Sequence, residues 1–228
     1  MLEYCIREDL KPKVKRLMAV IHPLKLIIDN YPEGETEELK AVNNPDNEEL
    51  GERTVTFSRE LWIEREDFME EPPKKYFRLF PGNEVRLMHA YFVKCTGCDK
   101  DSDGNITAVH CTYDPLTKQG TGAEMPRKVK GTIHWVNAGD AAPADIRLYE
   151  NIVDEEKGVY DEEGNINLNP SSLEVCKGFV EKSLSEAKAY DSFQFVRNGF
   201  FCADAKDSKP GKPVFNRIVS LKSSFKIQ

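Results

Sequence analysis

The chain has 228 residues, with 32 Lys and Arg against 39 Asp and Glu, which gives a formal net charge of −7. This length allows one large domain or two small domains with a substantial core. The hydrophobic share of 39% and the aromatic share of 10% argue against a disordered chain. The acidic balance excludes a protein that holds nucleic acid by bulk positive charge, so any RNA or DNA contact must be local.

The start of the chain, MLEYCIREDL, lacks the basic segment and apolar block of a secretion signal, and no apolar run is long enough to cross a bilayer. Six cysteines, at positions 5, 95, 98, 111, 176 and 202, do not have the dense, regular spacing of a small secreted domain. We therefore expect reduced thiols and a cytoplasmic protein without membrane contact.

Short runs of alternating apolar and polar residues, separated by turn residues, follow one another along the chain. They predict strands at 53–57, 85–95, 106–113, 129–136, 146–152 and 213–221. Two short helices are expected, one at 65–71 before two prolines and one that begins with a capping-box pattern at 183–186. The fold class is therefore mainly β, and the density of chain reversals favours barrels or sandwiches.

The stretch at 99–106, DKDSDGNI, imitates a calcium loop, with oxygen-bearing residues at alternate positions and Gly104 in sixth place. The twelfth position is His110, however, so the bidentate carboxylate of such a loop is missing. The flanks also alternate as strands do, whereas a calcium loop lies between helices. We therefore predict a hairpin turn at this point.

A zinc site could use Cys95 and Cys98, with His110 or Cys111 as further ligands, but no second ligand pair is present in the sequence. Thiols at strand ends are the simpler interpretation. The sequence also lacks a Gly-rich phosphate loop, a GxSxG elbow and the HxH or HExxH spacing of metal-binding histidines. We therefore expect no catalytic residue and no metal ligand.

Seven blocks of this sequence occur in the same order as in one known family and run from about residue 6 to residue 223. They read REDLKPKVKRLMAVIHPLKLIIDNY, RELWIEREDFMEEPPKKYFRLFPGNEVRLMHAY, GNITAVHCTYDP, RKVKGTIHWV, ADIRLY, SFQFVRNGFFCAD and KPVFNRIVSLK. In these blocks the chain resembles the C-terminal anticodon-binding region of the glutaminyl-tRNA synthetases, which are class I enzymes. The family's catalytic half, with its HIGH and KMSKS signatures for ATP, has no counterpart in this sequence.

The resemblance implies a fragment that binds tRNA and performs no chemistry. It implies two β-barrels, a proximal barrel built from residues 1–51 and 137–228 and a distal barrel built from residues 52–136. The implied partners are the anticodon loop of the glutamine tRNA and the catalytic domain of the same parent chain, with the protein as a monomer. The fragment itself would need no cofactor, whereas ATP and magnesium would belong to the parent's catalytic domain.

The resemblance also assigns residues to individual bases. Arg16, Gln194 and Arg197 correspond to residues that hold the central uridine, whose two carbonyl acceptors and one ring donor suit an amide and a guanidinium. Arg78 corresponds to the contact with the third anticodon base, a guanine, which arginine recognises through two parallel hydrogen bonds. Arg86 corresponds to a contact with the first base.

Two departures from the family pattern concern this set. Met88 stands where the family commonly has a second arginine, and it would share a strand face with Arg86 without donating a hydrogen bond. Lys222 replaces an arginine and is expected to contact phosphate only. Lys74 and Lys75, which follow a double proline, complete the expected RNA contacts.

Gln194 and Arg197 impose a geometric condition on this assignment. They are three positions apart and would face opposite sides of a flat strand. Both reach one base only if the backbone bends or bulges between them, and Gly199 is close enough to assist.

Three alternatives remain open at the level of sequence. The related barrels of a glutamyl-tRNA synthetase are the nearest, although the SFQFVRNGFF block favours glutamine. A free-standing, ribosomal-protein-like barrel that binds structured RNA is the second. A protein-interaction module without an RNA role is the third, and the net negative charge favours it mildly.

Overall fold

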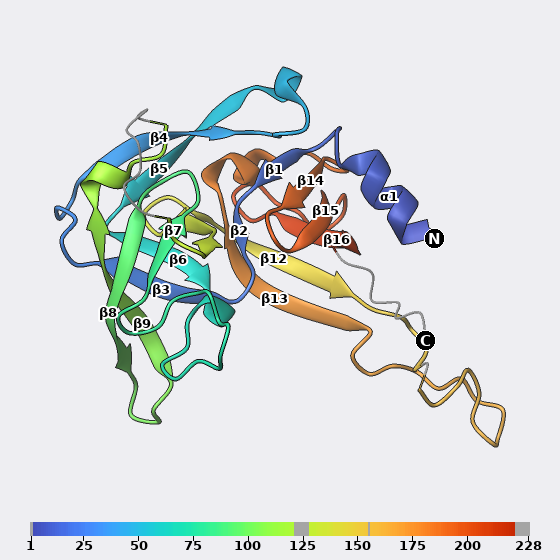
Figure 1. Cartoon of the computed structure of the whole chain (residues 1–228). Helices are drawn as coiled ribbons and strands as arrows, with labels where there is room; N and C mark the ends of the chain where they lie inside the picture. Colours follow the sequence, from blue (N-terminus) through green and yellow to red (C-terminus); the bar gives the residue numbers. More distant parts are fainter. Residues whose placement is uncertain (1, 121–127, 155, 222–228) are drawn as a thin grey trace.

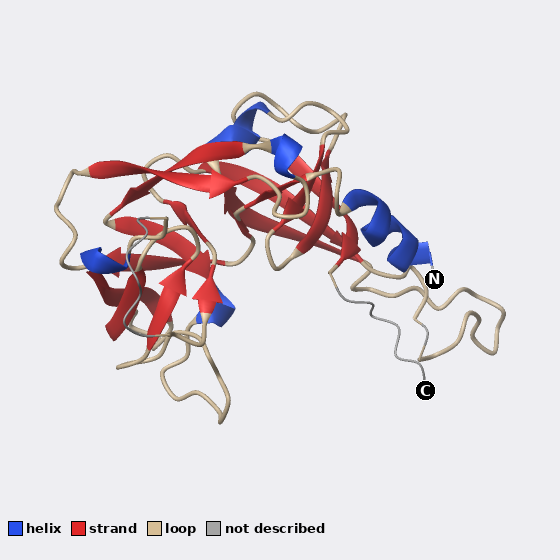
Figure 2. Ribbon diagram, turned by 45° about the horizontal axis from the view of Figure 1, so that its top comes forward, coloured by secondary structure: helices blue, strands red, loops and turns tan. Residues whose placement is uncertain are grey.

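The computed structural model describes residues 2–120, 128–154 and 156–221. Strands dominate these residues, as the sequence predicted, and the helical segments lie at the periphery (Figures 1 and 2). No helix within the described part is long and apolar enough to span a membrane. The strands form two seven-stranded sheets and one two-stranded ribbon.

The first sheet gathers strands from both ends of the chain. In spatial order it contains β1 (Lys15–Leu17), β14 (Ser192–Phe195), β15 (Gly199–Ala203), β16 (Val214–Ser220), β12 (Ala142–Tyr149), β13 (Leu173–Val180) and β2 (Ala19–Val20). The helix α1 (Leu2–Leu10) packs beside β16.

The second sheet uses mainly the middle of the chain. In spatial order it contains β10 (Thr132–Ile133), β7 (Glu84–Leu87), β8 (Phe92–Lys100), β9 (Ile106–Asp114), β3 (Pro23–Ile28), β6 (Glu60–Glu64) and β11 (Trp135–Asn137). The ribbon pairs β4 (Thr36–Val42) with β5 (Glu52–Ser58). Single 3₁₀ turns complete the fold: η1 (Glu48–Leu50), η2 (Arg65–Asp67), η3 (Pro115–Thr117) and η4 (Lys182–Glu186).

Each large sheet is nearly closed because one stretch of chain supplies both of its edges. In the first sheet only Met18 separates β1 from β2, which pair with β14 and β13 respectively. In the second sheet only His134 separates β10 from β11, which pair with β7 and β6. Met18 and His134 are both fully buried. Two nearly closed barrels result, with little unpaired strand edge.

The segment 17–21 is a wall shared by the two barrels. Leu17, Ala19 and Ile21 pack in the core of the first barrel. Met18 and Val20 pack in the core of the second barrel. Alternate side chains of an extended segment point to opposite faces, so this one stretch contributes to both cores, and none of its residues is more than 6% exposed.

The sequence placed several strands well and misjudged others. The strands expected at 53–57, 106–113 and 213–221 are confirmed, and the strand expected at 146–152 begins earlier, at Ala142. The strand expected at 85–95 is two strands, because the chain reverses at His89, which has a φ of 62°. The strand expected at 129–136 is broken at His134. The expectation did not include α1 or eight of the strands, β1, β2, β3, β4, β6, β13, β14 and β15.

The two expected helices were wrong in extent, since only single 3₁₀ turns form there, η2 and η4. Ser183 does not act as an N-cap, because Glu181 occupies that position without a side-chain hydrogen bond. In both places the chain continues at once into extended backbone. The local pattern was therefore satisfied by one turn.

The crossing from the first sheet to the second comes earlier than the boundary expected at residue 52. Strand β3, expected in the first barrel, pairs with β6 and β9 of the second. The reason is its alternation, which buries Leu24, Leu26 and Ile28 in the second core. The chain returns to the first sheet between β11 and β12.

The predicted hairpin turn joins β8 to β9 and is closed by its own aspartate. The Oδ1 atom of Asp101 accepts from the backbone N–H groups of Asp103 and Asn105, at 3.0 and 2.8 Å, and Gly104 has a φ of +83°. The calcium-like spacing therefore describes a tight turn. In the neighbouring strands, the ring nitrogens of His110 lie 2.9 Å from Asp29 and 3.0 Å from Asp99, and not against the nearby cysteines.

Candidate nucleic-acid interface

Arg16 and Gln194 lie side by side. They are register partners on the adjacent parallel strands β1 and β14. The following residue on each strand, Leu17 and Phe195, is buried in the first core, so Arg16 and Gln194 face away from that core. The structure thus joins two residues that are 178 positions apart in the sequence.

The Arg16 side chain is anchored through its terminal nitrogen. Its terminal nitrogen donates to the carboxylate of Asp46, and this hydrogen bond and charge lower the pKa of Asp46. The backbone N–H of Arg16 donates to the carbonyl oxygen of Asn43 at 2.6 Å. These contacts hold the backbone and the terminal nitrogen of Arg16 and leave its Nε atom without a partner among the described residues.

Two polar atoms of this pair are buried without a hydrogen-bond partner among the described residues. They are Nε of Arg16, a donor, and Oε1 of Gln194, an acceptor. An unsatisfied buried polar atom costs about 1–3 kcal/mol, and most such atoms in proteins have a partner. A donor and an acceptor on neighbouring strands thus both lack a partner among the described residues.

Arg197 does not join Arg16 and Gln194, because its side chain contacts Asp67. Strand β14 ends at Phe195, and the chain reverses through a turn in which Arg197 has a φ of 69°. The two terminal nitrogens of Arg197 donate to the two carboxylate oxygens of Asp67, each at 2.7 Å. The backbone does bend between Gln194 and Arg197, but the side chain of Arg197 contacts Asp67 and His134, which belong to the second barrel.

Asp67 also receives Arg78, so one carboxylate holds two of the expected RNA-binding arginines. The Asp67 side chain is fully buried, whereas those of Arg78 and Arg197 are 34% and 22% exposed. Burial acts to lower the pKa of Arg78, but the charges of Asp67 and Glu66 outweigh it and raise this pKa. The Oε1 atom of Glu66 lies 3.1 Å from Arg78. This arrangement fixes both guanidinium groups at the junction of the barrels.

Arg86 has a different environment on β7. Its guanidinium carbon lies 4.2 Å from the centroid of the Phe92 ring, and its terminal nitrogen lies 3.4 Å from the carbonyl oxygens of Ala90 and Thr117. Burial lowers the pKa of Arg86. Met88 lies beyond the end of the strand and packs partly buried against the second core.

The lysines of the expected set are less constrained. Lys74 and Lys75 are exposed in the turn before Tyr76, and Lys75 has a φ of 70°. The hydroxyl of Tyr76 donates to the carbonyl oxygen of Glu66 at 2.9 Å, which ties this turn to η2. Lys222 lies outside the described residues.

A buried polar cluster that the sequence did not reveal supports these arginines. Glu64 accepts from the backbone N–H groups of Ile21 and His22, both at 2.9 Å, and from the Asn198 side chain at 3.0 Å. Burial acts to raise the pKa of Glu64, but hydrogen bonds from His134 and the backbone outweigh it and lower this pKa to about 2. No sequence signal marks Glu64, which ends an apolar run, as buried.

Comparison with known proteins identifies a family for this chain. Two family models match, at residues 14–114 and 132–204, and both are described as the anticodon-binding domain of class I tRNA synthetases (E and Q). Together the matched segments contain every strand except β16, and every expected RNA-binding residue except Lys222.

The chain is also similar to several proteins named glutamine–tRNA ligase. It is 58% identical to that of Clostridium perfringens, with 100% of this chain and 41% of the relative covered. It is 54% identical to that of Cupriavidus necator and 51% identical to that of Bradyrhizobium diazoefficiens, over 98% and 99% of this chain and 38% and 40% of the relatives. The chain thus spans about two fifths of the length of these relatives. It belongs to the family of anticodon-binding domains of the class I tRNA synthetases for glutamate and glutamine.

Proposed function

We propose that this chain is the tRNA-recognition part of a glutamine–tRNA ligase and that it selects its tRNA by the anticodon. The observation that carries the proposal is the open donor on Arg16 beside the open acceptor on Gln194. Because a family for glutamate and glutamine includes both specificities, the choice of glutamine rests on the names and high identity of the relatives.

The central anticodon base fits the open pair. Uracil presents carbonyl acceptors beside a ring N–H donor, so Nε of Arg16 would donate to a carbonyl while Oε1 of Gln194 would accept from the ring. Such edges are accessible only in unpaired, unstacked bases, as in an anticodon loop. Recognition of one base by this pair would satisfy two atoms that are otherwise unpaired.

The remaining arginines fit the neighbouring bases. Arg197 lies in the turn that follows the strand of Gln194 and shares a carboxylate with Arg78, so it would connect the site of the central uridine to that of the third base, a guanine. Arg86, stacked on Phe92, would contact the first base. Lys74, Lys75 and Lys222 would contribute phosphate contacts.

The whole protein would join glutamine to its tRNA with ATP and magnesium in a catalytic domain, and this chain would supply none of that chemistry. Its partners would be the anticodon loop and that catalytic domain, within a monomer that works in the cytoplasm, where tRNA is charged. The anionic surface fits a binder that relies on a few chosen contacts.

Binding of anticodon stem–loops tests the proposal. We expect the unmutated 228-residue chain to prefer a glutamine stem–loop over one whose central uridine is replaced by cytidine. Gln194→Ala and Arg16→Ala should weaken binding of the uridine loop by about 1–3 kcal/mol each and reduce this preference. Fluorescence anisotropy with labelled stem–loops measures both quantities.

Lys15→Ala is the matched control for Arg16→Ala, because it removes the same charge from the exposed preceding residue of β1. It should leave the preference for uridine unchanged. If both variants retain the parent's preference, or if the glutamate stem–loop binds better than the glutamine stem–loop, the assignment is wrong. Absence of any RNA binding would favour a protein-interaction module.

A further inference from the structure

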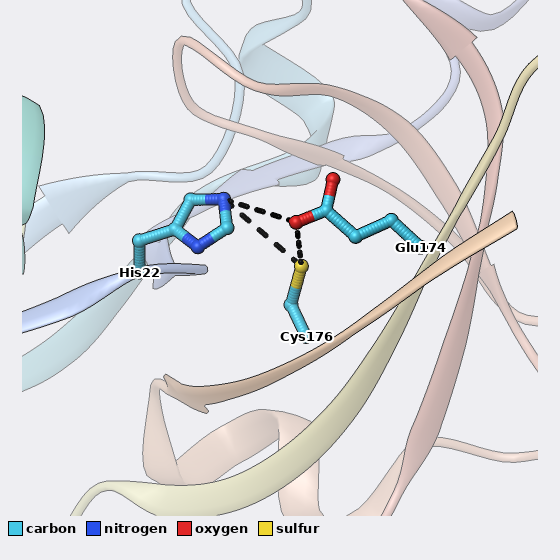
Figure 3. A group of neighbouring side chains, drawn as sticks. All are labelled: His22, Glu174 and Cys176. Atoms are coloured by element: carbon cyan, nitrogen blue, oxygen red, sulfur yellow. Dashed lines mark hydrogen bonds and ion pairs between the residues drawn. The ribbon is translucent and has the colours of Figure 1, made fainter. Parts of the chain in front are cut away.

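Three side chains with metal-binding atoms converge at the edge of the first sheet. They are His22, Glu174 and Cys176 (Figure 3). Nε2 of His22 lies 3.9 Å from Oε1 of Glu174 and 4.0 Å from Sγ of Cys176. The same Oε1 lies 3.3 Å from Sγ. All three atoms therefore face one point.

The backbone fixes this convergence. Glu174 and Cys176 are two positions apart on β13 and so share a face. His22 follows β2, the short strand that pairs with the far end of β13. The connector approaches β13 closely because residue 178 is glycine, where an added Cβ would lie 2.4 Å from the carbonyl oxygen of Val20.

His22 is held by its own backbone, which leaves its ring available. Its N–H donates to Glu64 at 2.9 Å and its carbonyl oxygen accepts from the N–H of Arg65 at 2.8 Å. The side chains of His22 and Glu174 are 54% and 60% exposed, so an ion can enter from solvent. Cys176 is 5% exposed and forms the inner wall.

We propose that His22, Glu174 and Cys176 form a binding site for a divalent cation of the zinc class, with a fourth coordination position open to water. Thiolate, imidazole and carboxylate are all zinc ligands, whereas calcium and magnesium take oxygen ligands only. Tetrahedral bonds of about 2.0–2.3 Å place ligand atoms about 3.3–3.8 Å apart. The observed separations differ from these by a few tenths of an ångström.

Binding replaces a proton with the ion. Without an ion, the thiol of Cys176 donates to Glu174. The incoming ion forms a bond to sulfur, and the displaced proton leaves to the buffer. One thiolate and one carboxylate then balance the two positive charges. The bound ion would tie the connector between the barrels to β13.

Cobalt titration of the metal-free, full 228-residue chain tests the site, because Co²⁺ replaces zinc and absorbs light. We expect one Co²⁺ per chain, with a thiolate-to-metal charge-transfer band and the strong visible bands of tetrahedral coordination, both abolished by added Zn²⁺. Cys176→Ser should abolish the charge-transfer band. His22→Gln and Glu174→Gln should each weaken Co²⁺ affinity at least tenfold.

Cys98→Ser and Cys202→Ser are matched controls, since each removes a partly exposed thiol outside the cluster, and both should keep the band. Absence of the band in the parent chain, or its survival in Cys176→Ser, would overturn the proposal. His22→Gln changes an exposed side chain, so it decides the question alone if Cys176→Ser does not fold. None of these outcomes depends on RNA binding.

Discussion

At the scale of single residues, the buried carboxylates of this molecule have hydrogen-bond donors close to them. Asp67 is buried because two guanidinium groups reach it, and Glu64 is buried because backbone N–H groups reach it. Loss of such a partner leaves a buried carboxylate unpaired, which is costly. Histidines show the same rule in both directions, since burial lowers the pKa of His89 while Asp99 and Asp29 raise the pKa of His110.

His89 predicts a loss of stability in mild acid. Burial, assisted by the charge of Arg53, lowers its pKa from 6.5 to about 4. The unfolded chain therefore binds this proton more readily, and the contribution present above pH 6.5 is lost as the pH falls toward 4. We expect His89→Asn, which tolerates the φ of 62°, to reduce the stability difference between pH 7 and pH 5 by about 2 kcal/mol.

Urea unfolding at the two pH values measures this difference, and His110→Gln is the opposite control. The raised pKa of His110 stabilises the folded state below pH 6.5, and this stabilisation is lost as the pH rises. Because His110→Gln lacks it, the free energy of unfolding of this variant should fall more between pH 7 and pH 5 than that of the unmutated chain. An identical pH dependence in His89→Asn and the parent would contradict the prediction.

At the scale of elements, one glycine allows two backbone segments that carry expected RNA-binding arginines to approach each other closely. Gly131 precedes β10, and its carbonyl oxygen accepts from the N–H of Arg86 at 2.9 Å. A Cβ at this position would lie 1.9 Å from the carbonyl oxygen of Phe77, the residue before Arg78. One glycine therefore sets the spacing between the segments that carry both arginines.

Gly131→Ala should force the segment at Phe77 to move. We expect a loss of about 1–3 kcal/mol in stability, as in other overpacked sites, together with weaker binding of the glutamine stem–loop. Denaturant midpoints and anisotropy measure the two effects. Gly97→Ala is the control, since nothing lies within 4 Å of its added Cβ. Equal effects of the two variants would contradict the prediction.

The mainly β class and several strands could be predicted because their alternation has one buried face. The run at 17–21, LMAVI, could not be recognised as strand because both of its faces are buried, in different cores, and it has no polar alternation. The pairing of Arg16 with Gln194 was expected only through family resemblance. The partners Asp46 and Asp67 could not be foreseen, since burial of a carboxylate depends on distant segments.

At the scale of the whole molecule, ionic and aromatic contacts join the parts. Arg53 of β5 contacts Glu181, after β13, through two hydrogen bonds of 2.6 and 2.5 Å, and both side chains are nearly buried. Trp62 of the second barrel stacks on Phe179 of the first, with centroids 4.7 Å apart. We therefore expect the two barrels to unfold together.

Arg53→Met should test this coupling. It leaves the carboxylate of Glu181 buried with only the N–H of Met18 as a hydrogen-bond donor among its described contacts, so we expect a loss of about 3 kcal/mol. Tryptophan fluorescence and far-ultraviolet circular dichroism should show one coincident urea transition in the parent and in the variant.

Lys177→Met, which breaks the exposed pair with Asp145, is the control and should cost less than about 1 kcal/mol. Two separate transitions in the parent chain would show that the barrels are independent and would contradict the expectation.

The shared wall at 17–21 decides where this protein can be engineered. A chain break, a circular permutation or an inserted reporter within the wall would damage both barrels, because the segment contributes side chains to both cores. The tips at Asp101–Asn105 and Asp161–Asn165 offer the reverse, since each aspartate closes its own turn through backbone N–H groups two and four residues later. New chain ends or a fluorescent label belong at those tips.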